Sequence, residues 1–269
     1  TASIRRTGNA VAVSLDDPAQ TARAAGELGK LAASIGNPGL GVTASDLDIR
    51  QSNGTVTLAL TDAGLTDRAA AAVEQSLEII RQRIDQVGVA EPTIQRVGSD
   101  RILVQLPGVQ DPARIRELLG STAKMGFHLL SDTATADFVP PGVTMLRDDE
   151  GRTYPVEDRV ELSGDRLTDA RVGFDQNTNE PIVSFRFDSA GAARFADITR
   201  ANVGRPFAIV LDDKVLSAPV IREPITAGSG QISGNFSVQS ATDLAAMLRA
   251  GALPAKLDRK STRLNSSHT

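Results

Sequence analysis

The sequence contains no cysteine, and this absence excludes several classes of site at once. Thiolate zinc sites, iron–sulfur clusters, disulfide frameworks and cysteine nucleophiles all need a thiol. The compartment stays open, because an oxidising space permits disulfides without requiring them. Tryptophan is also absent and aromatic residues make up 3% of the chain, so we expect a core built from Val, Ile, Leu and Ala.

An excess of positive charge is missing as well. The 29 basic and 33 acidic side chains give a formal net charge of -4. Proteins that bind nucleic acids normally carry a basic face. We therefore expect no nucleic-acid partner.

Long hydrophobic runs are lacking too. No stretch approaches the roughly 18 apolar residues that a membrane-spanning helix needs. No signal peptide is visible, and residue 1 is Thr rather than Met. The interpretation we favour is an internal piece of a longer protein whose membrane segments lie outside this sequence.

The clearest element is a long amphipathic helix over residues 66–87. Its apolar residues recur at steps of three or four, and Gly88 supplies its end. Charged residues, Arg83 among them, are predicted to lie mostly on the solvent face. Further helices are predicted over residues 18–34, 112–119, 189–202 and 240–250, and irregular loops over 35–41 and 131–156.

Alternating apolar residues and turn signals predict many short strands, with tight hairpin turns such as Asn53-Gly54. The strands are predicted at residues 10–15, 47–51, 55–61, 93–97, 101–106, 124–130, 159–162, 167–175, 181–188, 207–211, 214–218 and 231–236. The order β-α-β-β-α-β with further β and α elements predicts an α+β fold of the ferredoxin-like type. A boundary near residues 125–135 divides it into two subdomains.

Candidate catalytic residues are few. His128 lies on a predicted strand, where a hydrogen-bonded structural histidine is the favoured interpretation. It is the one histidine on a predicted element, so a Ser-His-Asp triad has one possible centre. Ser121 and Lys124 match the Ser-x-x-Lys pattern of penicillin-binding enzymes, but the companion motifs are absent. We therefore predict no catalytic residue.

Phosphate and metal sites are also poorly supported. Gly228-Ser229-Gly230 precedes a predicted strand rather than a helix, so a β-turn is favoured over a phosphate loop. The acidic pairs Asp148-Asp149 and Asp212-Asp213 are expected in solvated turns, and a loose Ca²⁺ contact around Asp148–Glu150 has no support. We predict neither a metal nor a cofactor.

One long stretch resembles a known family. Residues 83–108 read RIDQVGVAEPTIQRVGSDRILVQLPG, and further matching runs are 117–120 (ELLG), 202–206 (NVGRP), 209–212 (IVLD), 217–221 (SAPVI) and 248–254 (LRAGALP). Together they closely resemble the SecD family of protein-export subunits, over about residues 55–257. The motif positions are expected to be structural punctuation rather than reagents: Gly88, Val89, Ala90, Glu91, Pro92, Gly98, Arg101, Leu106, Pro107, Gly108, Arg249 and Gly251.

The resemblance implies a ferredoxin-like base subdomain, assigned to residues 1–130, and an α+β head subdomain, assigned to residues 131–252. Residues 253–269 are expected to be a remnant of a C-terminal strand and a disordered tail foreign to the family. Motion between base and head is expected at the hinge candidates Leu130, Ser131 and Gly251.

The resemblance also implies a location and partners. The region is expected on the periplasmic side of the bacterial inner membrane, contacting unfolded preprotein during late export that the proton-motive force assists. Expected partners are SecF, the SecYEG translocon and a YajC-type accessory subunit, and membrane contact is expected only through segments outside this sequence. A scaffold that binds only SecF and the translocon, and a cell-envelope hydrolase centred on His128 or on Ser121 and Lys124, remain alternatives.

Overall fold

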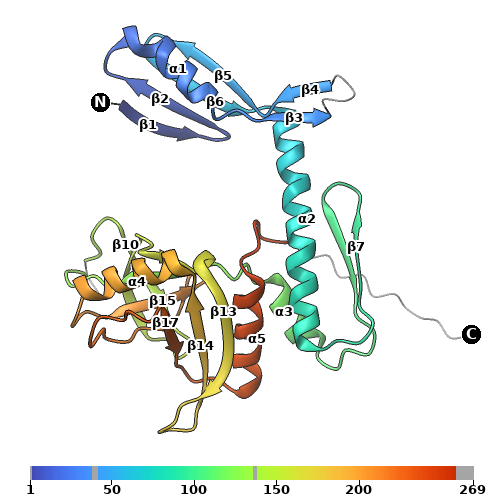
Figure 1. Cartoon of the computed structure of the whole chain (residues 1–269), viewed down its shortest axis with the longest axis vertical. Helices are drawn as coiled ribbons and strands as arrows, with labels where there is room; N and C mark the ends of the chain where they lie inside the picture. Colours follow the sequence, from blue (N-terminus) through green and yellow to red (C-terminus); the bar gives the residue numbers. More distant parts are fainter. Residues whose placement is uncertain (1, 38–41, 136–137, 259–269) are drawn as a thin grey trace, which may run out of the picture. The chain divides into compact units, whose positions relative to one another are not determined.

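The computed structural model describes residues 2–37, 42–135 and 138–258, which form two compact units (Figure 1). The first unit contains residues 1–74 and 96–102, and the second contains residues 75–95 and 103–269. The boundary passes through the long helix α2 (Asp62–Val87) and through the hairpin of β7 (Thr93–Val97) and β8 (Arg101–Gln105). Helices and strands are mixed along the whole chain, so the α+β prediction is confirmed.

The first unit is built on a four-stranded antiparallel sheet in the order β1-β2-β6-β5. Its strands are β1 (Ala2–Thr7), β2 (Ala10–Leu15), β5 (Leu47–Ser52) and β6 (Thr55–Leu60). A short helix η1 (Pro18–Gln20) leads into α1 (Thr21–Gly29), which packs on β5 and β6. A separate hairpin consists of β3 (Ser34–Asn37) and β4 (Val42–Ser45).

The turn between β5 and β6 shows how the sequence sets the register of this sheet. Asn53 and Gly54 both have positive φ, 32° and 78°, as a type I′ turn requires. This turn places Ser52 opposite Thr55 and Leu47 opposite Leu60. The Asn-Gly hairpin prediction is confirmed.

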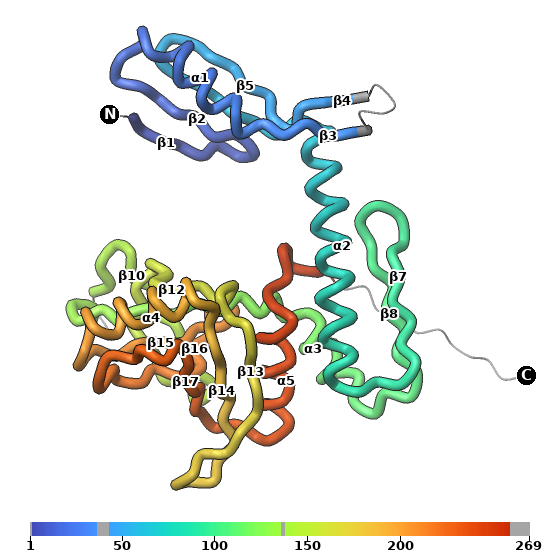
Figure 2. Tube along the Cα trace, in the orientation of Figure 1, coloured from blue at the N-terminus to red at the C-terminus, as the bar shows by residue number. Residues whose placement is uncertain are grey.

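The second unit contains a three-stranded sheet, a six-stranded sheet and three helices (Figure 2). The three-stranded sheet is β13 (Leu167–Phe174), β14 (Pro181–Phe187) and β17 (Ser229–Ile232). The six-stranded sheet, in spatial order, is β11 (Thr153–Glu157), β10 (Val143–Arg147), β16 (Lys214–Ser217), β15 (Phe207–Leu211), β9 (Met125–Leu129) and β12 (Leu162–Ser163). The helices are α3 (Pro112–Gly120), α4 (Ser189–Ala201) and α5 (Val238–Ala250), with a short η3 (Gly164–Arg166) before β13.

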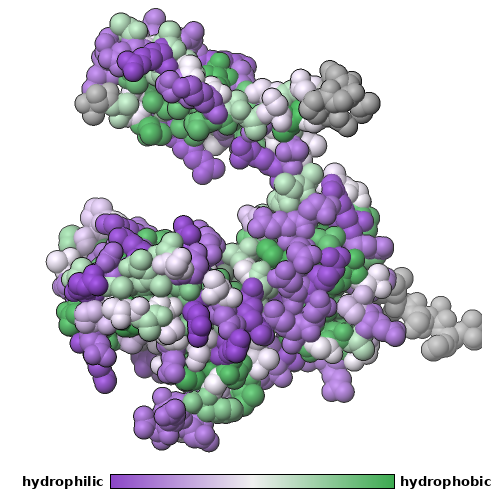
Figure 3. All heavy atoms as spheres, viewed as in Figure 1, coloured by the Kyte–Doolittle hydropathy of each residue, from purple (hydrophilic) through white to green (hydrophobic). Residues whose placement is uncertain are grey.

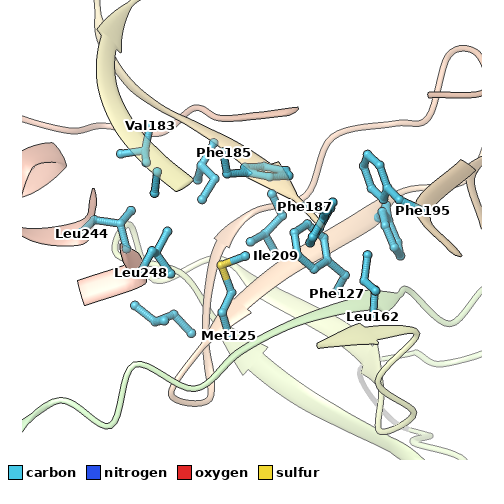
Figure 4. Packing of buried hydrophobic residues seen from close by; sticks show 14 of the residues in the cluster. Met125, Phe127, Leu162, Val183, Phe185, Phe187, Phe195, Ile209, Leu244 and Leu248 are labelled. Carbon is cyan, nitrogen blue, oxygen red and sulfur yellow. The ribbon is translucent and has the colours of Figure 1, made fainter. Parts of the chain in front are cut away.

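The main core of the second unit gathers side chains from both of its sheets and from α4 and α5 (Figure 4). Five phenylalanines meet there with ring centroids 5.2–6.4 Å apart: Phe127, Phe185, Phe187, Phe195 and Phe207. Five of the eight phenylalanines of the chain therefore lie in one cluster. The prediction of a purely aliphatic core is wrong for this unit.

The six-stranded sheet curls on itself. Leu130, just after β9, pairs with Val156 of the edge strand β11, and the Ser131 amide donates to the Pro155 carbonyl at 2.8 Å. This contact encloses a second, smaller core of Leu130, Val156, Ala208, Val210 and Val215. Strand curvature therefore gives the two faces of one sheet separate cores.

Several predicted elements differ from those in the structure. The helix predicted over residues 18–34 ends at Gly29, and residues 34–37 form β3; of the loop predicted over 35–41, residues 38–41 lie outside the described residues. The predicted loop over 131–156 contains β10 and most of β11, whose short runs lack clear alternation. The long helix begins at Asp62, four residues earlier than predicted, because the Leu65 amide already donates to the Thr61 carbonyl at 2.8 Å.

The predicted subdomain boundary between residues 130 and 131 stays a proposal. The structure contributes one fact to it, because β9 pairs with both β15 and β12 inside the six-stranded sheet. A boundary placed before Met125 would keep that sheet whole. Of the predicted tail over residues 253–269, Leu253 and Leu257 pack with Ile79 and Ala250, and residues 259–269 lie outside the described part of the chain.

Candidate functional site

Arg83 is the most unusual residue of the second unit, because its side chain is fully buried at 0% exposure. Its guanidinium donates to three main-chain carbonyls: Nη1 to Leu118 at 2.8 Å and to Ser121 at 2.6 Å, and Nη2 to Gly251 at 3.1 Å. Those carbonyls lie at the C-terminal ends of α3 and α5, where carbonyls lack helical partners and the helix dipole is negative. A single cation thus joins three segments that are far apart in the sequence.

The sequence-based assignment of Arg83 to the solvent face is wrong. In the C-terminal half of α2 the buried residues are Ser76, Ile79, Ile80, Arg83 and Ile84, which have the spacing of one continuous helical stripe. An arginine on a buried stripe is unfavourable unless its charge finds partners, because a buried unpaired charge is costly. The spacing was the available signal, but only the carbonyls of α3 and α5 make the position favourable.

Burial lowers the pKa of Arg83 to about 10, and the charge of Asp212 opposes that shift. The guanidinium therefore remains charged at neutral pH. Its Nε has no hydrogen-bond partner among the described residues. The three carbonyl bonds and the nearby carboxylate are what the structure offers to offset the cost of burying this cation.

Asp212 ties the β15–β16 turn to the segment between α3 and β9. Its carboxylate accepts from the Ser121 and Thr122 hydroxyls and from the amides of Ala123 and Lys124. Burial alone would raise the pKa of Asp212, but these hydrogen bonds together hold the pKa below its ordinary value. The prediction that this aspartate is simple turn chemistry is incomplete, because it also anchors a distant segment.

The same bonds describe Ser121 and Lys124. The Ser121 hydroxyl donates to Asp212 at 2.7 Å, and it is the amide of Lys124 that reaches that carboxylate, at 2.9 Å. A Ser-x-x-Lys nucleophile would need its hydroxyl close to the lysine amine. The described contacts of Ser121 are therefore those of a structural hydroxyl.

His128 is half-buried on β9, and its Nδ1 lies 2.8 Å from the Glu157 carbonyl. The Glu157 carboxylate accepts from Arg205 at 3.1 Å, and Arg205 also donates to the Leu130 carbonyl at 3.1 Å. His128 therefore contributes to the closure of the curled sheet beside the predicted hinge residue Leu130. Among the described residues, no three His, Asp or Glu side chains are grouped as a metal site would need.

A third charged contact joins α3 to α5. Arg114 binds Asp243 through two parallel bonds, Nε at 2.8 Å and Nη2 at 2.7 Å, and both side chains are mostly buried. The hydrogen bonds that Arg114 donates to Asp243 raise the pKa of Arg114. Bidentate geometry makes this pair stronger than an ordinary surface ion pair.

The motif positions lie where the chain turns. Gly88 (φ 72°) follows α2, Gly98 (φ 71°) lies in the β7–β8 turn, Gly108 (φ 71°) follows β8, and Gly251 (φ 83°) ends α5. Glu91 also has a positive φ, 47°. Their roles as structural punctuation remain a prediction, in keeping with the positive φ that five of them adopt. The other motif residues lie on or beside the same elements: Val89, Ala90, Pro92, Arg101, Leu106, Pro107 and Arg249.

Gly228 has a different constraint, since a Cβ there would lie 2.4 Å from the Cβ of Ala192. The glycine run thus permits a close approach of α4 before β17.

No helix in the described residues is long and apolar enough to cross a membrane.

Known protein families and relatives match most of this chain, including the segments that hold Arg83 and Asp212. Residues 73–132 match the family model "Protein translocase subunit SecDF, P1 domain, N-terminal", and residues 142–255 match "SecDF, P1 head subdomain". Protein translocase subunit SecD of Acetobacter pasteurianus is 53% identical over 212 residues, which are 77% of this chain and 41% of that protein. SecD of Rhodobacter capsulatus is 44% identical over 247 residues, 90% of this chain and 44% of that protein.

Solved structures agree with these relatives. A SecDF structure described as "a membrane component SecDF that enhances protein export" superimposes with a TM-score of 0.60 at 34% identity, covering 72% of this chain and 93% of that one. A crystal structure of SecDF in its super-membrane-facing form gives a TM-score of 0.59 at 36% identity, over 69% of this chain and 27% of that one. The chain spans less than half the length of the curated relatives. It belongs to the SecD/SecDF family, and its matched segments correspond to the P1 region.

Proposed function

We propose that this region is an extracytoplasmic, non-enzymatic module of the Sec export machinery that contacts preprotein during translocation. The observation that carries the proposal is the match of residues 73–132 and 142–255 to the two P1 models of a protein translocase subunit. The relatives are named as translocase subunits, and no enzyme family is indicated. Late export driven by the proton-motive force, and partners SecF, SecYEG and a YajC-type subunit, belong to the same proposal.

The head subdomain offers apolar side chains for such contacts. Phe174, Val203 and Val220 are about half exposed although their neighbours form the core. Apolar surface of this kind binds unfolded segments without reading their sequence. A periplasmic location is part of the proposal, because unfolded segments of an exported chain emerge there.

Motion of the head is proposed at the three hinge candidates. Gly251 has φ 83° and directly follows α5, a conformation that glycine adopts without strain, and its carbonyl accepts from Arg83. Leu130 and Ser131 are held by the bridge to Val156 and by the bond to Pro155. Breaking the curled sheet there would expose its small core.

Site-specific cross-linking to a stalled preprotein tests the proposal. Because the sequence has no cysteine, a single engineered cysteine is the only thiol in this region. Phe174→Cys and Val220→Cys in full-length SecD should form adducts with an arrested export substrate, whereas Arg50→Cys, exposed on the sheet of the first unit, serves as a reference position. No adducts at any head position would refute preprotein contact.

The same experiment separates the alternatives. Copurification with SecF and SecYEG without substrate adducts would favour the scaffold function. A hydrolase centred on His128, or on Ser121 and Lys124, would require that replacing those side chains abolishes activity in a protein that still folds. The side-chain contacts of His128 and Ser121 argue for loss of stability instead, whereas Lys124 reaches Asp212 through its main-chain amide.

A further inference from the structure

The sheet of the first unit has no function assigned to it by the family models, since the matched segments begin at residue 73. One edge of this sheet is β1, which pairs with β2 on one side only. All six of its residues are exposed, and no other described strand pairs with it. Unpaired main-chain groups along such an edge form a template for a further strand.

One face beside this edge is apolar and only half covered. The register aligns Ile4, Val13 and Val56 in one row across the sheet, and Val11 with Leu58 in the next. The helix α1 packs on β5 and β6, so Val56 is fully buried whereas Ile4 is 74% exposed and Val11 36% exposed. Figure 3 shows green, apolar surface on this unit in the area where Figure 1 places β1 and β2.

The edge carries positive charge without a carboxylate partner. Arg5 and Arg6 lie opposite Ala12 and Val11 on β2. Arg6 donates to the Gly8 carbonyl at 3.3 Å, and neither arginine forms an ion pair within the described residues. A strand that adds to β1 would place its own side chains beside these two guanidinium groups.

We propose that the free edge of β1 binds an extended, acidic segment of a translocating preprotein as a fifth strand of this sheet. The inference rests on the proposed function and extends it to a second contact surface. Main-chain bonds to β1 supply affinity without reading sequence, and alternate apolar side chains continue the row of Ile4 and Val13. The side chains between them lie on the other face, where Arg5 favours acidic residues.

A second copy of this chain fits the same edge poorly. Antiparallel pairing of β1 with its own copy would bring Arg5 and Arg6 of one chain next to those of the other, and like charges across strands are destabilising. Basic residues on edge strands commonly prevent such self-association. The charge that discourages a second copy therefore favours an acidic occupant.

Fluorescence anisotropy of the whole chain with labelled peptides tests this inference. The probes are ten-residue peptides with Val at alternate positions and either Glu or Lys between them, together with a Glu peptide N-methylated along its backbone. At low salt the Glu peptide should bind about threefold more tightly than the Lys peptide, because Arg5 lies on the face that its Glu side chains share, whereas Arg6 lies on the face of Ile4 and of the Val side chains. That preference should vanish near 1 M salt, where charges are screened, and the N-methylated peptide should not bind.

Variants with matched charge separate the edge from the rest of the sheet. The double variant R5E/R6E should prefer the Lys peptide, and Ile4→Ser should weaken all peptides several-fold. The control R23E/R50E changes the net charge equally, on α1 and on the opposite edge strand β5, and should bind like the parent chain. Circular dichroism establishes that each variant is folded.

Equal binding of the Glu and Lys peptides, tight binding of the N-methylated peptide, or a dimer that R5E/R6E alters would each overturn the inference. Such a failure is distinguishable from failure of the proposed function. If only this inference fails, cross-links between the head and preprotein would persist. If the proposed function fails, those cross-links would be missing.

Discussion

Replacing the buried Arg83 tests whether the carbonyl cluster stabilises the second unit. In Arg83→Met the apolar stem is kept, but the carbonyls of Leu118, Ser121 and Gly251 lose their donor. Hydrogen bonds from a charged donor contribute about 1.5–3 kcal/mol each, and removing the charge also relieves its burial cost. We expect a net loss of about 4 kcal/mol in the free energy of unfolding.

For a unit of this size, that loss corresponds to a midpoint lower by roughly 8–16 °C. Urea unfolding followed by circular dichroism measures the free energy, and a thermal scan measures the midpoint. The stability of Arg83→Lys should lie between that of the parent chain and that of Arg83→Met, because one ammonium cannot reproduce the planar guanidinium that reaches three carbonyls.

The matched control is Arg81→Met, two residues away on the same helix. Arg81 is half exposed and pairs with Glu78 at i,i+3 on the surface, so the expected change is below about 0.5 kcal/mol. If Arg83→Met unfolds within about 1 kcal/mol of this control, the carbonyl cluster does not stabilise the fold and the reasoning is refuted.

Three further predictions concern single residues. Asp212→Asn should lower the free energy of unfolding at pH 7 by about 1–2 kcal/mol. Because the pKa of Asp212 is lowered in the folded protein, the stability difference between parent and variant should shrink as pH falls through and below 4 and be lost in strong acid. A difference that stays constant with pH would contradict the role of the ionised Asp212 carboxylate. Phe127→Ala should cost about 3–5 kcal/mol by urea unfolding, since four rings pack on Phe127, whereas Phe174→Ala at the surface should cost less than about 1 kcal/mol. Gly64→Ala should destabilise the first unit, because its Cβ would lie 2.4 Å from the Asp46 carbonyl oxygen, whereas Gly26→Ala, with open space around it, should be neutral or stabilising in the same thermal scan.

Asp46 is a second charged residue whose burial and contacts only the folded chain reveals. Its buried carboxylate accepts from the Ala33 amide at 2.6 Å and from Arg68 at 3.1 Å, and its carbonyl accepts from the Thr61 amide. The Ala33 bond, with Arg68, holds the pKa of Asp46 below its ordinary value although burial acts against it. Nothing in the run Ser45-Asp46-Leu47 distinguishes this aspartate from a solvated turn residue.

Local signals were sufficient where the structure is decided by neighbours in the chain. Asn53-Gly54 set a hairpin, Gly88 ended α2, and alternation identified β14, because turns, caps and strand periodicity depend on a few adjacent residues. The motif in residues 83–108 was also sufficient to indicate the family. It named no reacting group, since its residues shape turns.

Distant contacts decided the rest. Whether Arg83 is exposed depends on carbonyls 35, 38 and 168 positions away, and whether β9 belongs to one subdomain or the other depends on its pairing with β15 and β12. The free edge of β1 likewise exists only because β2, β6 and β5 take the order that they do. The sequence by itself determined the elements, the turns and the family, whereas burial of charge, sheet order and exposed edges were decided by the tertiary structure, because each is a relation between segments that no local pattern encodes.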